Sequence, residues 1–220
     1  MAQTKINNKQ LQADGWTLAT DSWTYASATT ITVDSGAAAI YSIGDKFKLT
    51  ANSVVLQGYI ITIADTLLTV VGDALTNHVF SATYYSKAAT PLGFPHWFAY
   101  TPTGISATNV TLTGRFCLIN RSCQVQFLAT FTGGITFTTM PTLPIPASAS
   151  RILNVYNPCG EAGYIDAGTI DKPNGLRPFI NPSGTVLNIA IWGGVSTINA
   201  TYPITWANND KIEAYVVYDI

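Results

Sequence analysis

The sequence contains few charged residues. Only 10% of its 220 residues are Asp, Glu, Lys or Arg, whereas soluble proteins average about 25%. The net charge is −1 and no basic stripe is visible, so we do not expect nucleic acid as a partner. Since 47% of the residues are hydrophobic, we expect the chain to bury apolar surface against copies of itself or other subunits.

Long apolar runs and cysteines are also scarce. No hydrophobic run approaches the ~18 residues that a membrane-spanning helix needs, so we expect no membrane insertion. The polar segment from Met1 to Asp14 lacks the apolar core of a secretory signal. Cys117, Cys123 and Cys159 are too few for a disulfide framework. Synthesis in a reducing cytoplasm is the simpler interpretation.

The motifs of metal and cofactor sites are missing. The chain has two histidines, His78 and His96, and neither has a Cys or His at the spacing of a zinc site. There is no G-x-S-x-G sequence, no phosphate-binding loop and no dinucleotide fingerprint. We therefore expect no metal and no cofactor.

Two acidic patterns deserve comparison with enzymes. The run Asp34-Ser35-Gly36 resembles the motif of aspartic proteases, but that chemistry needs two carboxylates sharing a proton. The only other candidate, Asp65-Thr66-Leu67, lacks the glycine, so a hairpin turn is the favoured interpretation. Glu161, Asp166 and Asp171 could form a hydrolase cluster, although a solvated loop explains them better. We expect no enzyme.

The first part of the chain reads as short strands. Runs of β-branched and aromatic residues alternate with turn residues, and they predict strands at 22–25, 29–33, 46–49, 54–63, 67–71 and 79–85. These strands leave no room for a long helix, so residues 16–86 are expected to form a small closed β-barrel. Residues 1–15 form an arm that is either a docking segment or a frayed terminus.

Residues 87–102 read as an ordered connector between two β domains. Pro91, Pro95 and Pro102 lack backbone donors and disfavour helix or central strand, while a flexible linker would be rich in Gly and Ser. The alternative is an aromatic loop closing one larger domain. We expect Trp97 to be buried between the two halves. The full set of connector packing residues is Phe94, His96, Trp97, Phe98 and Tyr100.

The remaining part, residues 103–220, is predicted to be a β-sandwich of jelly-roll type, which makes the fold class all-β. Strands are expected at 114–119, 123–131, 135–138, 151–156, 162–170, 177–180, 185–191, 204–206 and 211–218. Cys117 and Cys123 lie symmetrically about Asn120 in the first hairpin. We expect them to face each other as reduced thiols, because opposed Cβ atoms lie about 4.5–5.5 Å apart, beyond the disulfide ideal.

Three aromatic residues near the C-terminus are candidates for a ligand or interface surface. Trp192, Tyr202 and Trp206 could form a platform on which a sugar stacks. They could equally belong to the core, where most large aromatic side chains lie. The sequence alone leaves both interpretations open.

Three features carry a resemblance to a known group. The first is W-T-Y-A-S-A-T-T-I-T-V at 23–33 followed by G-D-K-F-K-L-T at 44–50. The second is A-D-T-L-L-T-V at 64–70 followed by Y-Y-S-K-A-A-T-P-L-G-F-P-H-W-F at 84–98, and the third is G-R-F-C-L-I-N-R-S-C at 114–123. Together they resemble the virion structural proteins of tailed bacteriophages, in particular tail-fibre and minor structural proteins with a P-L-G-F-P-x-W-F connector. The resemblance covers most of the chain after Trp16.

The resemblance implies a non-enzymatic virion subunit, made in the host bacterial cytoplasm, that forms a homotrimer and contacts other capsid or tail proteins. We expect a tail-fibre, baseplate or receptor-binding subunit, with a host-surface glycan as a further partner. The alternatives are a capsid decoration protein of the cement or head-fibre kind and a carbohydrate-binding module. The trimer contacts are expected from an apolar run that could otherwise be core: Ile189, Ile191, Trp192, Val195 and Ile198.

Overall fold

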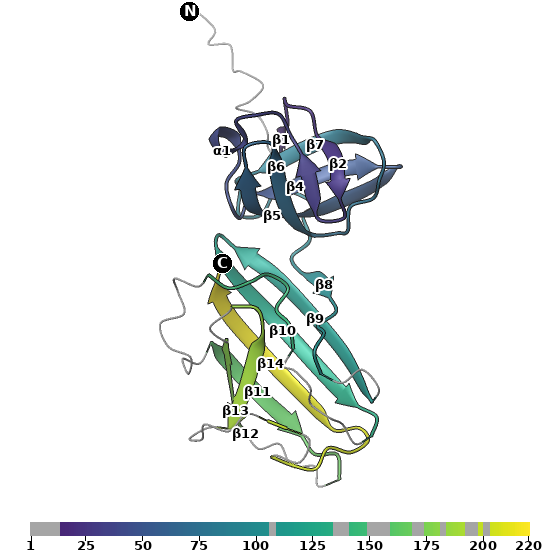
Figure 1. Cartoon of the computed structure of the whole chain (residues 1–220), viewed down its shortest axis with the longest axis vertical. Coiled ribbons are helices and arrows are strands. Elements are labelled where there is room, and N and C mark those ends of the chain that lie inside the picture. The colour runs from purple at the N-terminus through teal and green to yellow at the C-terminus, as the bar shows by residue number, and fades with distance from the viewer. Residues whose placement is uncertain are drawn as a thin grey trace, which may run out of the picture. The chain divides into compact units, whose positions relative to one another are not determined.

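The computed structural model describes residues 14–105, 109–133, 141–148, 159–168, 174–180, 184–191, 198–199 and 203–220. The chain divides into two compact units. The first comprises the chain up to Phe98 with Ile119–Arg121, and the second comprises Ala99–Leu118 and Ser122–Ile220. Within the described residues each unit is built on one seven-stranded antiparallel sheet (Figure 1). The all-β prediction is confirmed.

The first unit is a sheet that curls around its own core. Its strand order is β1-β7-β4-β5-β6-β3-β2. The elements are β1 (Thr17–Leu18), β2 (Thr24–Ser27), β3 (Thr30–Thr32), α1 (Ala37–Ile40), β4 (Lys46–Ala51), β5 (Val54–Ala64), β6 (Leu67–Gly72) and β7 (Phe80–Ser86). All six predicted strands are present, whereas β1 and α1 were not predicted. The described strands do not close the barrel, since β1 and β2 remain edges of the sheet.

Period-two alternation builds the core of the first unit. In β4, Phe47 and Leu49 are fully buried, and they pack with Ile31, Ile60 and Leu68 from three other strands. Burying one face of each strand fixes the register, because a one-residue slip would exchange the two faces. α1 is four residues long, and no described helix is long and apolar enough to cross a membrane.

The beginning of the connector belongs to the first unit. Trp16 is 1% exposed, and its Nε1–H donates to the Leu92 carbonyl at 2.9 Å. The Leu92 N–H in turn donates to the Asp14 carbonyl at 2.8 Å. The Phe94 ring packs against Trp16 and Tyr59, with centroid distances of 5.9 and 5.1 Å. The proline-rich segment therefore packs over Trp16 as part of the fold.

The second unit is also organised around one sheet, with strand order β13-β12-β11-β14-β10-β9-β8. Its strands are β8 (Phe98–Tyr100), β9 (Val110–Ile119), β10 (Ser122–Phe131), β11 (Gly160–Ile165), β12 (Asn174–Ile180), β13 (Leu187–Ile191) and β14 (Lys211–Asp219). The predicted strands at 135–138 and 151–156 lie outside the described residues. The structure shows a sandwich-like β architecture without establishing the jelly-roll connections.

The predicted strand at 204–206 is wrong. This segment is irregular, and Pro203, which precedes it, has no N–H to donate to a ladder. The segment ends in a turn in which the Asp210 carboxylate accepts the Ala207 N–H at 2.6 Å. It serves to place Trp206 in the core instead of extending the sheet.

Strand β14 is the centre of the second sheet. It pairs with β10 over nine residue pairs and with β11 over six. Its even-numbered residues from Ile212 to Tyr218 are buried, while Glu213, Tyr215 and Val217 are exposed. The Tyr218 hydroxyl donates to the Ile145 carbonyl at 2.9 Å, so the segment 141–148 packs over the inner face. The outer face of β14 is left to solvent.

The cysteines of the β9–β10 hairpin do not face each other. β9 ends at Ile119 and β10 begins at Ser122, so the turn is one residue shorter than the prediction required. Cys117 lies beside Gln124, with Sγ 3.8 Å from Oε1. Cys123 is buried on the inner face of the sheet, as are the alternate residues that follow it in β10. The two thiols therefore lie on opposite faces of the sheet, and all three cysteines are free.

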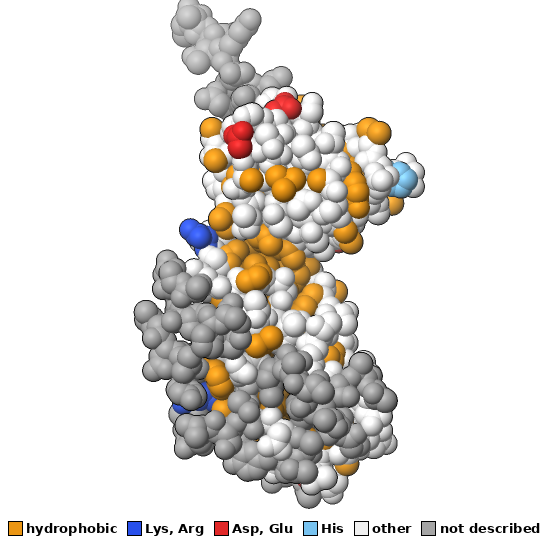
Figure 2. Space-filling view, viewed as in Figure 1, with side chains coloured by type: hydrophobic (Ala, Val, Ile, Leu, Met, Phe, Trp, Pro, Cys, Tyr) orange, Lys and Arg blue, Asp and Glu red, His pale blue; other side chains and the backbone are white. Residues whose placement is uncertain are grey.

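Charged side chains are sparse on the face seen in Figure 2, where apolar atoms are interspersed with polar ones. The described residues with large exposed apolar side chains include Val54, Val55, Val79 and Leu92 in the first unit. This surface is what the low charge content predicts.

The packing of Trp16 is testable by substitution. Trp16→Ala should lower the free energy of unfolding of the first unit by about 3–5 kcal/mol, as for other buried Trp residues. Trp16→Phe should cost less, since it keeps most of the packing and loses the hydrogen bond to Leu92. Urea denaturation followed by circular dichroism measures both. Leu92→Ala is the control: its side chain is 74% exposed and the substitution keeps the carbonyl. Equal effects of Trp16→Ala and Leu92→Ala would contradict the packing described here.

The buried thiols predict slow chemical modification. Burial raises the pKa of Cys123 to about 12 and raises the pKa of Cys117, and only the thiolate is reactive. At pH 8 the folded protein should therefore react with a disulfide reagent at these two positions far more slowly than the chain unfolded in urea. Peptide mapping of the labelled protein identifies the sites. Rapid labelling of Cys123 in the folded protein would contradict the burial.

Candidate functional site

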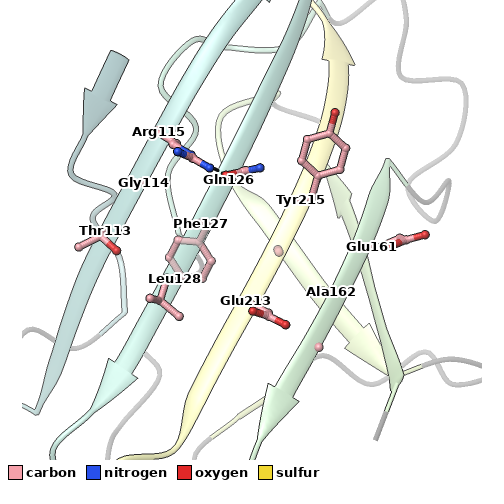
Figure 3. Close-up of a pocket in the computed structure, with 12 residues that line it drawn as sticks. Thr113, Gly114, Arg115, Gln126, Phe127, Leu128, Glu161, Ala162, Glu213 and Tyr215 are labelled. Atoms are coloured by element: carbon pink, nitrogen blue, oxygen red, sulfur yellow. Dashed lines mark hydrogen bonds between the residues drawn. The ribbon is translucent and has the colours of Figure 1, made fainter. Parts of the chain in front are cut away.

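A solvent-open groove crosses the outer face of the second sheet (Figure 3). Its volume is about 560 Å³, within the range of about 300–1,000 Å³ typical of ligand pockets. Four adjacent strands line it, each with a run of three residues: 113–115 of β9, 126–128 of β10, 213–215 of β14 and 161–163 of β11. We call this surface the outer groove.

Strand register arranges the outer-facing side chains of the groove in two rows. In the first row Tyr215 of β14 is paired with Gln126 on one side and Glu161 on the other. In the second row Glu213 is paired with Leu128 and Gly163. The intervening residues of each run point inward, so backbone forms the floor of the groove. A rigid ladder therefore sets the positions of these side chains.

Arg115 extends the first row on β9. Its Nε–H donates to Oε1 of Gln126 at 2.5 Å, as the dashed line in Figure 3 indicates. With Oε1 engaged, the amide nitrogen of Gln126 is directed elsewhere and can donate to a ligand. Charge-assisted bonds of this kind are short and directional, so the pair forms a fixed polar wall.

The middle of the groove combines apolar surface with carboxylates. Tyr215 is 38% exposed and Leu128 is 36% exposed, so a ring and an aliphatic side chain are both available for contact. Glu161 and Glu213 are also exposed. Neither glutamate makes a hydrogen bond or ion pair with another described residue. The Tyr215 ring combines an apolar face with a polar hydroxyl, and residues of this kind are enriched at interfaces.

The aromatic candidates predicted near the C-terminus do not form this groove. Trp206 is 1% exposed. Its ring packs against Phe131 at 4.8 Å and Tyr164 at 6.1 Å, and its Nε1–H donates to the Asn199 carbonyl at 2.8 Å. Trp206 is therefore core and cannot stack on a sugar. Trp192 and Tyr202 lie outside the described residues.

The connector residues divide between the two units. Phe94 and Phe98 pack on each other at 5.5 Å in the first unit. Tyr100 packs against Phe116 at 6.1 Å in the second unit, and burial raises its pKa. His96 is exposed and its ring contacts the half-buried Trp97 at 5.5 Å. The burial of Trp97 between the two halves stays a prediction.

The acidic motif at 34–36 is a turn into α1, not the hairpin turn that was predicted. Gly36, at φ 94°, precedes the helix, a conformation that glycine adopts without strain. The Asp65 carboxylate accepts the Ser35 hydroxyl at 2.7 Å and the Gly36 N–H at 2.9 Å. These two bonds lower the pKa of Asp65. Since a proton-sharing pair raises one pKa, the arrangement of Asp65 is that of a turn-stabilising carboxylate.

The other acidic candidates are separated. Glu161 lies in the outer groove, Asp166 accepts the Gly168 N–H at 2.9 Å in a local turn, and Asp171 lies outside the described residues. Among the described residues no group of three or more His, Cys, Asp or Glu side chains could hold a metal ion. The predicted hydrolase cluster therefore has no counterpart in the part of the chain that is described.

Sequence reasoning missed the outer groove because its members are far apart in the chain. The one sequence feature that coincides with the groove does not mark it without the structure. The chain contains only two glutamates, Glu161 and Glu213, and both line the groove. Their proximity becomes visible only once β11 is known to pair with β14.

Comparison with known proteins gives no match. No protein-family model, no curated protein and no solved structure matches this chain.

Proposed function

We propose that this chain is a non-enzymatic structural subunit of a bacteriophage virion, of the tail-fibre, baseplate or receptor-binding class, and that its outer groove binds a host-surface glycan. The sequence resemblance of the 84–98 region supports the virion assignment. The outer groove is the observation that carries the receptor-binding part, because it offers the exposed Tyr215 ring beside hydrogen-bonding side chains on a rigid sheet. A jelly-roll connectivity of the second unit belongs to the same proposal.

The absence of buried carboxylates in the groove favours binding over hydrolysis. Glycosidases raise the pKa of one acid by placing it in a low-dielectric pocket. Glu161 and Glu213 are both exposed to solvent on an open sheet face. The proposal therefore assigns them to recognition.

A homotrimer remains part of the proposal, but the apolar run expected to form its contacts gives it little support. Ile189 and Ile198 are 0% and 1% exposed within the second unit, so they are core. The side chain of Ile191, and the whole of Trp192 and Val195, lie outside what is described. Sedimentation of the full chain at tens of micromolar tests the trimer, and a monomer would contradict it.

Two related functions share this geometry. A capsid decoration protein would sit on the head, and a carbohydrate-binding module need not be part of a virion. Immunogold labelling of purified particles distinguishes them: label at the tail supports our assignment, label on the head supports decoration, and no label contradicts a virion role.

Glycan binding is tested with matched variants on one strand. Tyr215→Ala should weaken binding of the full chain to any glycan that scores on an array by about tenfold or more, because truncating an anchoring aromatic residue costs about 2 kcal/mol and ~1.4 kcal/mol is tenfold. Val217→Ala should leave affinity unchanged. Val217 lies on the same face of β14, 37% exposed, but does not line the groove. Equal binding of wild type and Tyr215→Ala would contradict the proposed site.

A further inference from the structure

The outer groove runs across the strands of the sheet. Its walls are the two rows of outward-facing side chains, and its floor is the backbone between the rows. The floor residues are paired from strand to strand as the rows are: Phe127 of β10 with Ala214 of β14, and Ala214 with Ala162 of β11. Since each row joins neighbouring antiparallel strands, a channel between two rows is perpendicular to the strands.

The groove is longer across the strands than along them. Neighbouring strands lie about 4.8 Å apart, so the four lining strands span about 14 Å. The two rows are two residues apart on each strand, a distance of about 7 Å. A ligand that fills the groove is therefore elongated and one chain wide.

The β11 end of the groove is open. Gly163 has no side chain, and a Cβ added there would meet only Oε1 of Glu213, at 3.9 Å. Glu161, which ends the first row on β11, is directed away from β14 in Figure 3. Arg177, on the next strand β12, does not line the groove. Among the described residues that line it, none therefore closes this end.

The β9 end is open as well. Arg115 is bonded through its Nε–H to Gln126 on β10, so its side chain lies along the first row instead of across the channel (Figure 3). Thr113, which ends the second row, has a short side chain. The strand beyond β9 is β8, and none of its described residues lines the groove. A chain can therefore leave the groove on this side too.

The volume of the groove sets the length of ligand that it holds. One hexose unit takes up about 180 Å³, the volume of roughly six water molecules. The groove measures about 560 Å³, which corresponds to about three such units. Tyr215 and Leu128, the partly exposed apolar side chains of the lining set, lie on the two middle strands β14 and β10. The apolar contact surface is therefore at the centre of the groove.

We infer that the outer groove binds about three consecutive sugars inside an unbranched polysaccharide whose chain crosses the strands and leaves the groove at both ends. This inference rests on the proposed glycan-binding function. The middle sugar packs on Tyr215 and Leu128, the outer sugars lie over β9 and β11, and Gln126 bonds to a hydroxyl from the first row. A channel one chain wide excludes branches, and its two open ends favour a repeating polymer over a short glycan.

Fragments of different length test the inference. The probes contain two, three or six sugars and are prepared by partial acid hydrolysis of the bacterial surface polysaccharide that binds the full chain most tightly on the array. In isothermal titration calorimetry of the full chain, the three-sugar fragment should bind about tenfold or more tightly than the two-sugar fragment. The six-sugar fragment should bind within about fourfold of the three-sugar fragment, since it adds only further registers in the same groove. An aromatic label on its reducing end should leave the affinity unchanged.

Two matched variants test the direction of the chain. Gly163→Phe places a ring at the β11 end and should weaken binding of the six-sugar fragment about tenfold or more. Thr130→Phe is the control. Thr130 is paired with Lys211, one row beyond the second row, and does not line the groove, so a chain that crosses the strands does not pass over it. Thermal unfolding confirms that each variant is folded; if Gly163→Phe is not, Thr113→Phe obstructs the opposite end instead.

The outcomes distinguish the inference from the function on which it rests. If the two-sugar fragment binds as tightly as the six-sugar fragment, or if the label on the reducing end abolishes binding, the inference is overturned and the glycan-binding function stays. Binding that is lost in Thr130→Phe but kept in Gly163→Phe indicates a chain along the strands and also overturns it. If no surface polysaccharide on the array binds, both fail.

Discussion

The arrangement of the second unit depends on β14, in which buried and exposed residues alternate and which is paired with a strand on each side. β14 pairs along its length with β10 and along most of it with β11. Its inner face is fixed by the buried Ile212 and Val216 and by the hydrogen bond from Tyr218 to Ile145. A slip by one residue would place Glu213 and Tyr215 in the core. The outer groove thus owes its geometry to packing on the opposite side of the sheet.

In the first unit a comparable constraint comes from Trp16. Its indole is enclosed by the segment that begins the connector and bonded to Leu92, and Lys48 Nζ lies 4.4 Å from its ring centroid. The Ser86 hydroxyl donates to the Gly15 carbonyl at 2.6 Å. These contacts make the proline-rich segment part of a folded unit. Prolines are tolerated in this segment because it does not belong to a strand, and most of the contacts that hold it involve side chains and backbone carbonyls.

The sequence predicted the positions of individual strands better than the way in which the strands pair and the faces on which their side chains lie. The strand at 211–218 was predicted almost to its ends, because its alternation is strict, and six of the seven strands of the first unit were predicted, all but β1. The cysteines were misplaced because a turn one residue shorter moves Cys117 to the other face. Trp206 could be core or platform until its burial against Phe131 and Tyr164 and its hydrogen bond to the Asn199 carbonyl placed it in the core. The outer groove could not be predicted, since four distant segments form it and only the pairing of β11 with β14 brings Glu161 beside Tyr215.

The most direct test concerns the outer face around β14, which we propose as the ligand-binding surface. Amide chemical shifts of the isotopically labelled full chain, titrated with the glycan that binds most tightly on the array, report on binding residue by residue. We expect shifts concentrated at 113–115, 126–128, 161–163 and 213–215, with the first unit unaffected. Shifts confined to the first unit, or spread evenly over both units, would contradict it.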